Sequence, residues 1–134
     1  MRQIWITRAG APEVLAVKEA PDPEPKAGEV RVRVEASGVN FADILGRMGL
    51  YPDLPPLPVV PGYEVSGRVD AVGRDVEGDW TGRDVIAMTR FGGYADTVCV
   101  PKNQVFRRPP GMSAADMPGG RRKTWFFGTQ TVSA

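Results

Sequence analysis

The chain has 134 residues, with 17 Lys and Arg against 16 Asp and Glu, one cysteine and no histidine. This length suits one domain, and a formal net charge of +1 gives no field that would attract nucleic acid or a membrane surface. The absence of histidine excludes a histidine base and a zinc site built from cysteine and histidine, so we expect no metal centre.

Alternating residues predict strands over much of the chain. Between residues 29 and 36, valines and an alanine at every second position are separated by charged side chains, which is the period of a half-buried strand. Residues 65–71 repeat the pattern, with glycines at expected bends. Further strand-like runs are separated by Gly, Pro and Asp, so we expect a compact, mostly antiparallel β-barrel with one short helix. Cys99 lies in one such run and is interpreted as a small packing residue.

The one clear helix follows the strand at residues 29–36. Asn40 is a preferred N-cap residue, Asp43 lies where a carboxylate satisfies the first N–H groups, and Gly49 is a natural stop. The stripe expected to be buried consists of Phe41, Ile44, Leu45 and Met48. Asn40, Asp43 and Arg47 share the opposite face, and Asp43 and Arg47 have the spacing of an ion pair. On spacing alone, Asn40 and Asp43 are explained by helix capping.

A stiff loop follows the helix, because residues 52–61 contain five prolines. Such a segment suits a linker, a proline-rich ligand for an aromatic groove, or a wall of the domain. Its apolar residues favour the wall, which would pack on the body and present Tyr51 beside the helix. These apolar residues are Leu54, Leu57, Val59 and Val60.

Three motifs in this region resemble a known superfamily. Residues 38–43 read Gly-Val-Asn-Phe-Ala-Asp, residues 47–51 read Arg-Met-Gly-Leu-Tyr, and residues 61–64 read Pro-Gly-Tyr-Glu. They resemble the N-terminal GroES-like catalytic domain of the medium-chain dehydrogenase/reductase superfamily. Its zinc-dependent alcohol dehydrogenases carry a cysteine and a histidine ligand where this chain has Asn40 and Tyr63. The chain is therefore similar to the zinc-free NADPH:quinone oxidoreductase branch.

The resemblance implies a reaction and roles for individual residues. The reaction is hydride transfer from NADPH to a quinone or another α,β-unsaturated carbonyl compound. Asn40 and Asp43 would lie near the nicotinamide as cofactor-binding residues, with Asn40 and Tyr51 as the catalytic residues. Tyr51 would donate a hydrogen bond to the carbonyl oxygen as negative charge develops there. The residues expected to line the substrate pocket are Tyr51, Tyr63 and Arg47. Glu64, without a zinc ion, would make a structural hydrogen bond or ion pair.

The resemblance ends near residue 116. We expect a GroES-like domain over residues 1–116 and a tail unlike the family over residues 117–134, where Pro118 and two glycines would stop a helix. No G-x-G-x-x-G motif occurs, so the Rossmann pyrophosphate loop is missing. The chain is interpreted as a truncated oxidoreductase that is inactive alone and binds no cofactor. The alternative is a non-catalytic GroES-like module that binds a partner.

The interpretation also leads to expectations about self-association and cellular location. A domain without its partner half would expose strand edges and apolar surface, and we expect it to self-associate through them. No segment is long and apolar enough to span a bilayer and no signal peptide is visible, so we expect a cytoplasmic protein.

Overall fold

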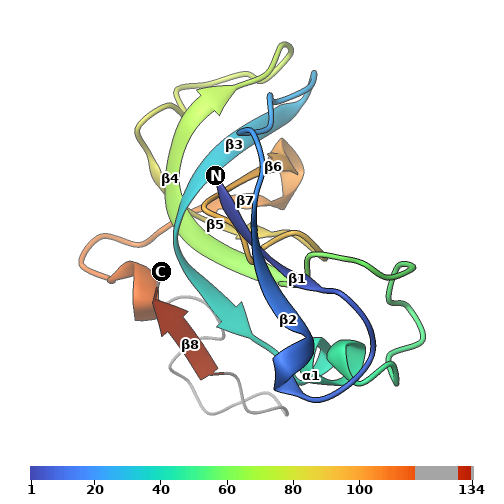
Figure 1. The fold of residues 1–134 in the computed structure, drawn as a ribbon. Coiled ribbons are helices and arrows are strands. Elements are labelled where there is room, and N and C mark those ends of the chain that lie inside the picture. Colours follow the sequence, from blue (N-terminus) through green and yellow to red (C-terminus); the bar gives the residue numbers. More distant parts are fainter. Residues whose placement is uncertain (117–129, 134) are drawn as a thin grey trace.

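A computed structural model describes residues 1–116 and 130–133, and short antiparallel strands dominate it (Figure 1). The strands are β1 (Arg2–Ile6), β2 (Leu15–Glu19), β3 (Glu29–Val39), β4 (Glu64–Val72), β5 (Asp84–Met88), β6 (Thr97–Pro101), β7 (Val105–Arg107) and β8 (Gln130–Ser133). Within the described residues α1 (Phe41–Arg47) is the one α-helix. Single 3-10 turns are η1 (Pro12–Val14), η2 (Lys102–Gln104) and η3 (Ala114–Asp116). The prediction of a mostly β chain with one short helix is confirmed.

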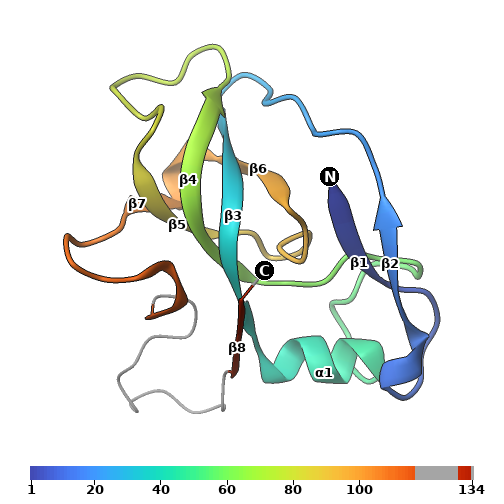
Figure 2. The same ribbon diagram turned by 60° about the vertical axis from the view of Figure 1, so that its left-hand side comes forward.

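The strands form two sheets. β1 and β2 pair as a hairpin, and the larger sheet has the order β6-β3-β4-β5-β7, with β8 added to β3. Among the described residues β6 and β7 are the two ends of this order, so the strongly curved sheet is open where a complete barrel would close (Figure 2). β2 has no counterpart in the sequence prediction, because four of its five residues are exposed and leave only a weak pattern.

β3 is the strand from which the candidate site is built. β4 runs along one of its edges, while β6 and β8 share the other, pairing with Glu29–Arg33 and Ala36–Val39 respectively. The strand continues three residues beyond the predicted end at residue 36 and passes directly into α1, as Figure 2 shows. Gly67 of β4 lies so close to β3 that a Cβ there would be 2.0 Å from the carbonyl oxygen of Arg33.

The core lies on the inner face of the larger sheet. The alternation predicted for β3 is observed, since Val30 and Val32 have no exposed surface. Valines from neighbouring strands pack into the same cluster. Burial of apolar surface, at about 25 cal/mol per Å², is the main source of its stability. The cluster consists of Val30, Val32, Val34, Val65, Val69, Val85, Ala87, Val100 and Val105.

The proline-rich loop packs on the body, as predicted. Val59 forms an isolated antiparallel bridge with Ile6 of β1, and Val60 is buried. Leu54 lies against α1 at Gly46, where an added Cβ would be 3.0 Å from Leu54 Cδ1. The loop therefore connects β1 to the helix. Of the predicted tail, residues 117–129 and 134 lie outside the described residues, and residues 130–133 form β8.

Candidate functional site

α1 begins at Asn40, where β3 ends. Asn40 has the extended backbone of an N-cap residue, and its N–H donates to Asp43 Oδ2 at 2.8 Å. A carboxylate at this third position satisfies one of the N–H groups that helix geometry leaves without a partner, and it also faces the positive end of the helix dipole. The predicted cap is thus observed, but capping is only part of what Asp43 does.

Asp43 is the best-connected side chain of the site. It is 6% exposed, and besides the Asn40 bond it accepts the N–H of Gly62 on Oδ1 at 3.0 Å and the hydroxyl of Tyr94 on Oδ2 at 3.2 Å. Three donors come from three separate segments: the helix start, the loop before β4 and the loop before β6. The carboxylate therefore ties these segments together at one point.

Burial and hydrogen bonding oppose each other at this carboxyl. Burial raises the pKa of Asp43, while the donors Asn40, Gly62 and Tyr94 act in the lowering direction without cancelling it. Burial, helped by the negative charge of Asp43, also raises the pKa of Tyr94. The phenol therefore stays protonated at physiological pH and acts as a donor.

The loop over residues 61–64 depends on a glycine. Gly62 has φ +105°, a conformation that side chains disfavour, and a Cβ there would lie 2.6 Å from Tyr94 Cδ1. The carbonyl of Gly62 accepts the Thr89 hydroxyl at 2.6 Å and the N–H of Gly93 at 3.2 Å. Both backbone polar groups of Gly62 therefore have partners, and Tyr63 is the next residue after this rigid turn.

Asn40 also reaches the end of this loop. Its side-chain amide donates to Glu64 Oε1 at 3.3 Å, which gives Glu64 the structural hydrogen bond expected of it. Gly38 leaves room for the carboxylate, because a Cβ at that position would lie 2.4 Å from the same Oε1 atom. The two positions at which the zinc-dependent relatives of the predicted superfamily place ligands, Asn40 and Tyr63, thus lie on connected segments.

Three aromatic rings form a group beside the loop. Tyr51 and Tyr63 meet edge-on with ring centroids 6.1 Å apart, and Tyr63 and Phe91 are 5.3 Å apart at a tilt of 56°. The hydroxyl oxygen of Tyr63 is buried and has no hydrogen-bond partner among residues 1–116 and 130–133. Burial raises the pKa of Tyr63. The structure therefore brings together two of the predicted pocket residues, Tyr51 and Tyr63.

Comparison with known proteins identifies this arrangement. Residues 26–110, which run from before β3 to beyond β7, match the family described as the alcohol dehydrogenase GroES-like domain. The chain belongs to that family. The match lies inside the domain predicted over residues 1–116.

The relatives of the GroES-like domain include VAT-1 homologs and quinone oxidoreductases. The domain is 41% identical over 115 residues to the synaptic vesicle membrane protein VAT-1 homolog of Rattus norvegicus, an alignment that covers 84% of this chain and 28% of that protein. The crystal structure of the human VAT-1 homolog-like protein superposes with a TM-score of 0.83 at 36% identity, covering 87% of this chain and 38% of that one. The quinone oxidoreductase from Thermus thermophilus, solved also with NADPH, gives a TM-score of 0.73 at 38% identity, covering 87% and 35%.

These relatives place the GroES-like domain in the medium-chain dehydrogenase/reductase superfamily, as predicted. The chain spans 28% to 38% of the length of the relatives named above.

The helix of the GroES-like domain is turned the opposite way from the prediction. Phe41, Ile44 and Met48, expected to be buried, are 45%, 37% and 47% exposed, whereas Asp43 and Gly46 are buried. The polar face is buried because Asp43 has three hydrogen-bond donors there. Leu54 also comes close to α1 at Gly46, so three of the four predicted apolar residues lie outside, while Leu45 is half-buried.

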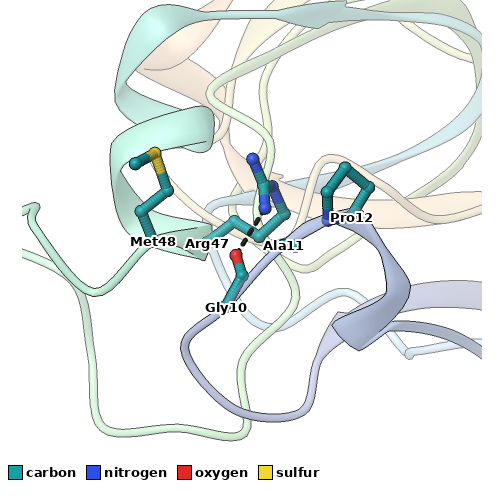
Figure 3. A pocket seen from close by; sticks show the side chains of 5 residues that line it. All are labelled: Gly10, Ala11, Pro12, Arg47 and Met48. Atoms are coloured by element: carbon teal, nitrogen blue, oxygen red, sulfur yellow. Dashed lines mark hydrogen bonds between the residues drawn. The ribbon is translucent and has the colours of Figure 1, made fainter.

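Arg47 is the second correction. Within the part of the chain that the structure describes, Arg47 makes no ion pair with Asp43; its guanidinium donates to the carbonyl of Gly10 instead (Figure 3). Asp43 already has its donors on the inner side, so the arginine turns to the loop before η1. There it lines a shallow pocket of about 350 Å³ with Gly10, Ala11, Pro12 and Met48.

Two further features bear on the chemistry of the GroES-like domain. Among residues 1–116 and 130–133, no group of three His, Cys, Asp or Glu side chains is placed to hold a metal ion. Cys99 is half-buried with Sγ 3.6 Å from the Pro23 carbonyl oxygen, and burial raises the pKa of its thiol to about 11. A thiol with that pKa is protonated at neutral pH and is a poor nucleophile.

Sequence reasoning missed Tyr94. Residues 92–98 read Gly-Gly-Tyr-Ala-Asp-Thr-Val, and β6 begins only at Thr97, so Tyr94 lies in the loop before that strand. A usable signal was the pair Gly92-Gly93, because adjacent glycines before a tyrosine indicate that another backbone comes close. The structure shows that this backbone is residues 61–62.

Proposed function

We propose that this domain is the substrate-side part of a zinc-independent, NADPH-dependent oxidoreductase that reduces a quinone or another α,β-unsaturated carbonyl compound. The observation that carries the proposal is the pairing of Tyr51 with Tyr63 beside the loop that Asn40 and Asp43 hold in place. Flat conjugated rings pack well against such edge-on aromatic walls. The T. thermophilus relative is named a quinone oxidoreductase and was solved with NADPH, which supports the reaction class.

Each residue has one part in the proposal. Tyr51 donates its hydroxyl hydrogen to the substrate carbonyl oxygen as charge develops there. Tyr63 forms the wall behind the substrate, since its ring is fixed between Tyr51 and Phe91. Asn40 and Asp43 form the floor where the nicotinamide would lie. Arg47 has no part in this arrangement, because it bonds to Gly10 in a separate pocket.

The fit of NADPH to this sequence is incomplete. When bound, NADPH supplies the hydride, while the protein orients and polarises the acceptor. The sequence has no G-x-G-x-x-G loop to bind the pyrophosphate, so the phosphates of the cofactor need polypeptide that this sequence does not contain. We therefore propose that residues 1–134 alone neither bind NADPH tightly nor turn over.

The proposal is tested with two proteins. The first is the chain itself, for which calorimetry with NADPH should show no tight binding. The second is a fusion of residues 1–116 to the dinucleotide-binding part of the T. thermophilus quinone oxidoreductase, which should oxidise NADPH only when a quinone is present. Tyr51→Phe in the fusion should lower kcat by about 10²-fold, the usual cost of removing one donor to a developing oxyanion. Ser113→Ala deletes an exposed hydroxyl that donates to Asp116 Oδ2 at 2.7 Å, and it is the control for loss of a hydroxyl away from the aromatic group.

The two contrary results have different meanings. A fusion that binds NADPH but reduces no quinone or enone would favour the alternative of a non-catalytic GroES-like binding module. Unchanged kcat in Tyr51→Phe would remove the hydroxyl from the mechanism while leaving the reaction class intact.

We also propose that the protein is cytoplasmic. No helix in residues 1–116 is long and apolar enough to cross a membrane. Fractionation of cells that express a tagged chain decides this, and recovery with vesicles rather than with the cytosol would contradict it.

A further inference from the structure

Tyr94 contacts β1, the loop before β4 and the start of α1, but has no part in the proposed chemistry. Its backbone N–H donates to the Pro61 carbonyl at 3.0 Å, and its carbonyl accepts the N–H of Ile4 in β1 at 2.9 Å. Its hydroxyl extends to Asp43 Oδ2 at 3.2 Å. The residue is therefore anchored by its backbone to β1 and the loop, and by its side chain to the start of α1.

We propose that Tyr94 is a positioning residue that, through Asp43, sets the placement of Tyr63 relative to Asn40. The inference rests on the proposed function for its consequence in catalysis, but its structural content does not depend on that function.

The loop is held from two sides, by the segment containing Tyr94 and by Asp43 of α1. On one face, the N–H groups of Gly92 and Gly93 donate to the carbonyls of Val60 and Gly62, at 2.9 and 3.2 Å. On the other face, the Gly62 N–H points to Asp43 Oδ1. Tyr63 comes next in the chain, so its ring orientation follows from how firmly this peptide is held.

The hydroxyl is the adjustable part of this arrangement. Asp43 Oδ2 accepts from Tyr94 and from the Asn40 N–H at once, so the phenol limits where the carboxylate can rotate. If the hydroxyl is removed, the carboxylate can turn toward Asn40 and its bond to Gly62 weakens. A side chain that only filled space would give no such effect.

Hydrogen exchange distinguishes a Tyr94 that positions Asp43 from a Tyr94 that only fills space. Asn40 and Gly62 donate their amides to Asp43, whereas Val69 in β4 donates to the Arg83 carbonyl at 3.0 Å and reports on the sheet. General destabilisation speeds exchange at all three amides by one factor. Loss of the positioning contact speeds exchange at Gly62 and leaves Val69 unchanged.

The experiment compares Tyr94→Phe with Tyr63→Phe in the full chain. Both delete one phenolic hydroxyl, but that of Tyr63 makes no hydrogen bond to Asp43. We expect the Gly62 amide to exchange about tenfold faster in Tyr94→Phe, with Val69 unchanged, and no change at either amide in Tyr63→Phe. An equal change at Gly62 and Val69, or none at Gly62, overturns the proposal.

A measurement on the unmodified chain covers the case in which Tyr94→Phe fails to fold. Because Gly62 and Tyr94 both donate to Asp43, the Gly62 amide shift and the Tyr94 ring shifts should titrate with the midpoint of the Asp43 carboxyl carbon. Glu64 also acts on Tyr94, and its own carboxyl carbon gives its midpoint separately. A midpoint at Gly62 or Tyr94 that differs from that of Asp43 overturns the proposal.

The catalytic consequence is read in the fusion enzyme. Tyr94→Phe should lower kcat/KM for quinone reduction by about tenfold, because the Tyr63 ring that it misplaces forms the wall behind the substrate. An inactive parent fusion would refute the proposed function, while the exchange data would still decide the role of Tyr94.

Discussion

Asp43→Asn tests the central contact of the site with the smallest change of shape. Asp43 offers two acceptor oxygens to three donors, with Gly62 on Oδ1 and Asn40 and Tyr94 on Oδ2. An asparagine amide has one acceptor oxygen. In either orientation its NH₂ faces one backbone N–H, that of Gly62 or that of Asn40, whereas the Tyr94 hydroxyl can rotate to accept. One backbone N–H is therefore left without an acceptor.

The magnitude follows from that count. One unsatisfied buried donor costs about 1–3 kcal/mol, so Asp43→Asn should lower the free energy of unfolding by that amount at neutral pH. Since whole domains are stable by only about 5–15 kcal/mol, the loss is a large fraction of the total.

The pH dependence has a definite sign. Burial raises the pKa of Asp43 in the folded state, so its contribution to stability is fully present below the unfolded pKa of about 3.9 and is lost as pH rises through the folded pKa. The variant lacks this contribution. The difference in unfolding free energy between parent and variant should therefore be largest in acid and shrink toward neutral pH.

Urea unfolding followed by tryptophan fluorescence at several pH values measures both effects. Asp53→Asn is the matched control, because Asp53 is an exposed residue of the proline-rich loop, and it should change the unfolding free energy by less than about 0.5 kcal/mol. Equal stability of parent and Asp43→Asn at neutral pH would show that the three donors do not depend on this carboxylate in solution. A difference that grows with rising pH would reverse the sign of the pKa argument.

Three other changes have clear expected outcomes. Gly67→Ala places a Cβ 2.0 Å from the Arg33 carbonyl oxygen, so thermal melting should show a loss of about 1–3 kcal/mol or more, and a loss below about 0.5 kcal/mol would contradict the close approach of β4 to β3. Ile44→Lys places a charge on the exposed face of α1 and should leave stability within about 0.5 kcal/mol. If that face self-associates, sedimentation should give less oligomer for Ile44→Lys than for the parent; an unchanged distribution excludes this face. Cys99 should react with a thiol reagent at neutral pH much more slowly than free cysteine, since burial raises its pKa to about 11, and fast labelling of the folded chain would refute this.

The core strands and the helix limits could be predicted from the sequence because their signals are local, whereas the exposed strand β2 could not. Val30 and Val32 alternate with charged residues, and this period alone places them inside. Asn40 and Gly49 mark the ends of α1 through backbone chemistry that needs no tertiary partner, and Gly49 has the positive φ of +75° expected at a helix stop.

The orientation of α1 could not be predicted in the same way. Helical spacing shows that Phe41, Ile44 and Met48 share a face, but not which face meets the body of the domain. That choice is made by residues outside the helix: Gly62 and Tyr94 supply donors to Asp43, and Leu54 fills the space beside Gly46. Gly46 was the available clue, because a glycine inside a helix costs about 1 kcal/mol and is retained where another segment comes close.

The same limit explains why Arg47 was misassigned. Spacing of four residues permits an ion pair with Asp43, but a carboxylate that is 6% exposed and already has three donors is not accessible to a surface arginine. The partners of both residues lie far along the chain, at Gly10 for Arg47 and at Gly62 and Tyr94 for Asp43. Pairings of this kind belong to the tertiary fold.

The edges of β3 have a consequence for how the protein is made. Arg33 of β3 pairs with Thr97 of β6. β6 leaves the ribosome long after β3. At a synthesis rate of 5–20 residues per second, β3 waits roughly 3–13 s for that strand. During this interval β3 exposes backbone donors and acceptors along a strand with one apolar face, and such an unpaired edge can pair with another chain. Slow synthesis of residues 34–97 should therefore increase the need of the nascent chain for chaperones.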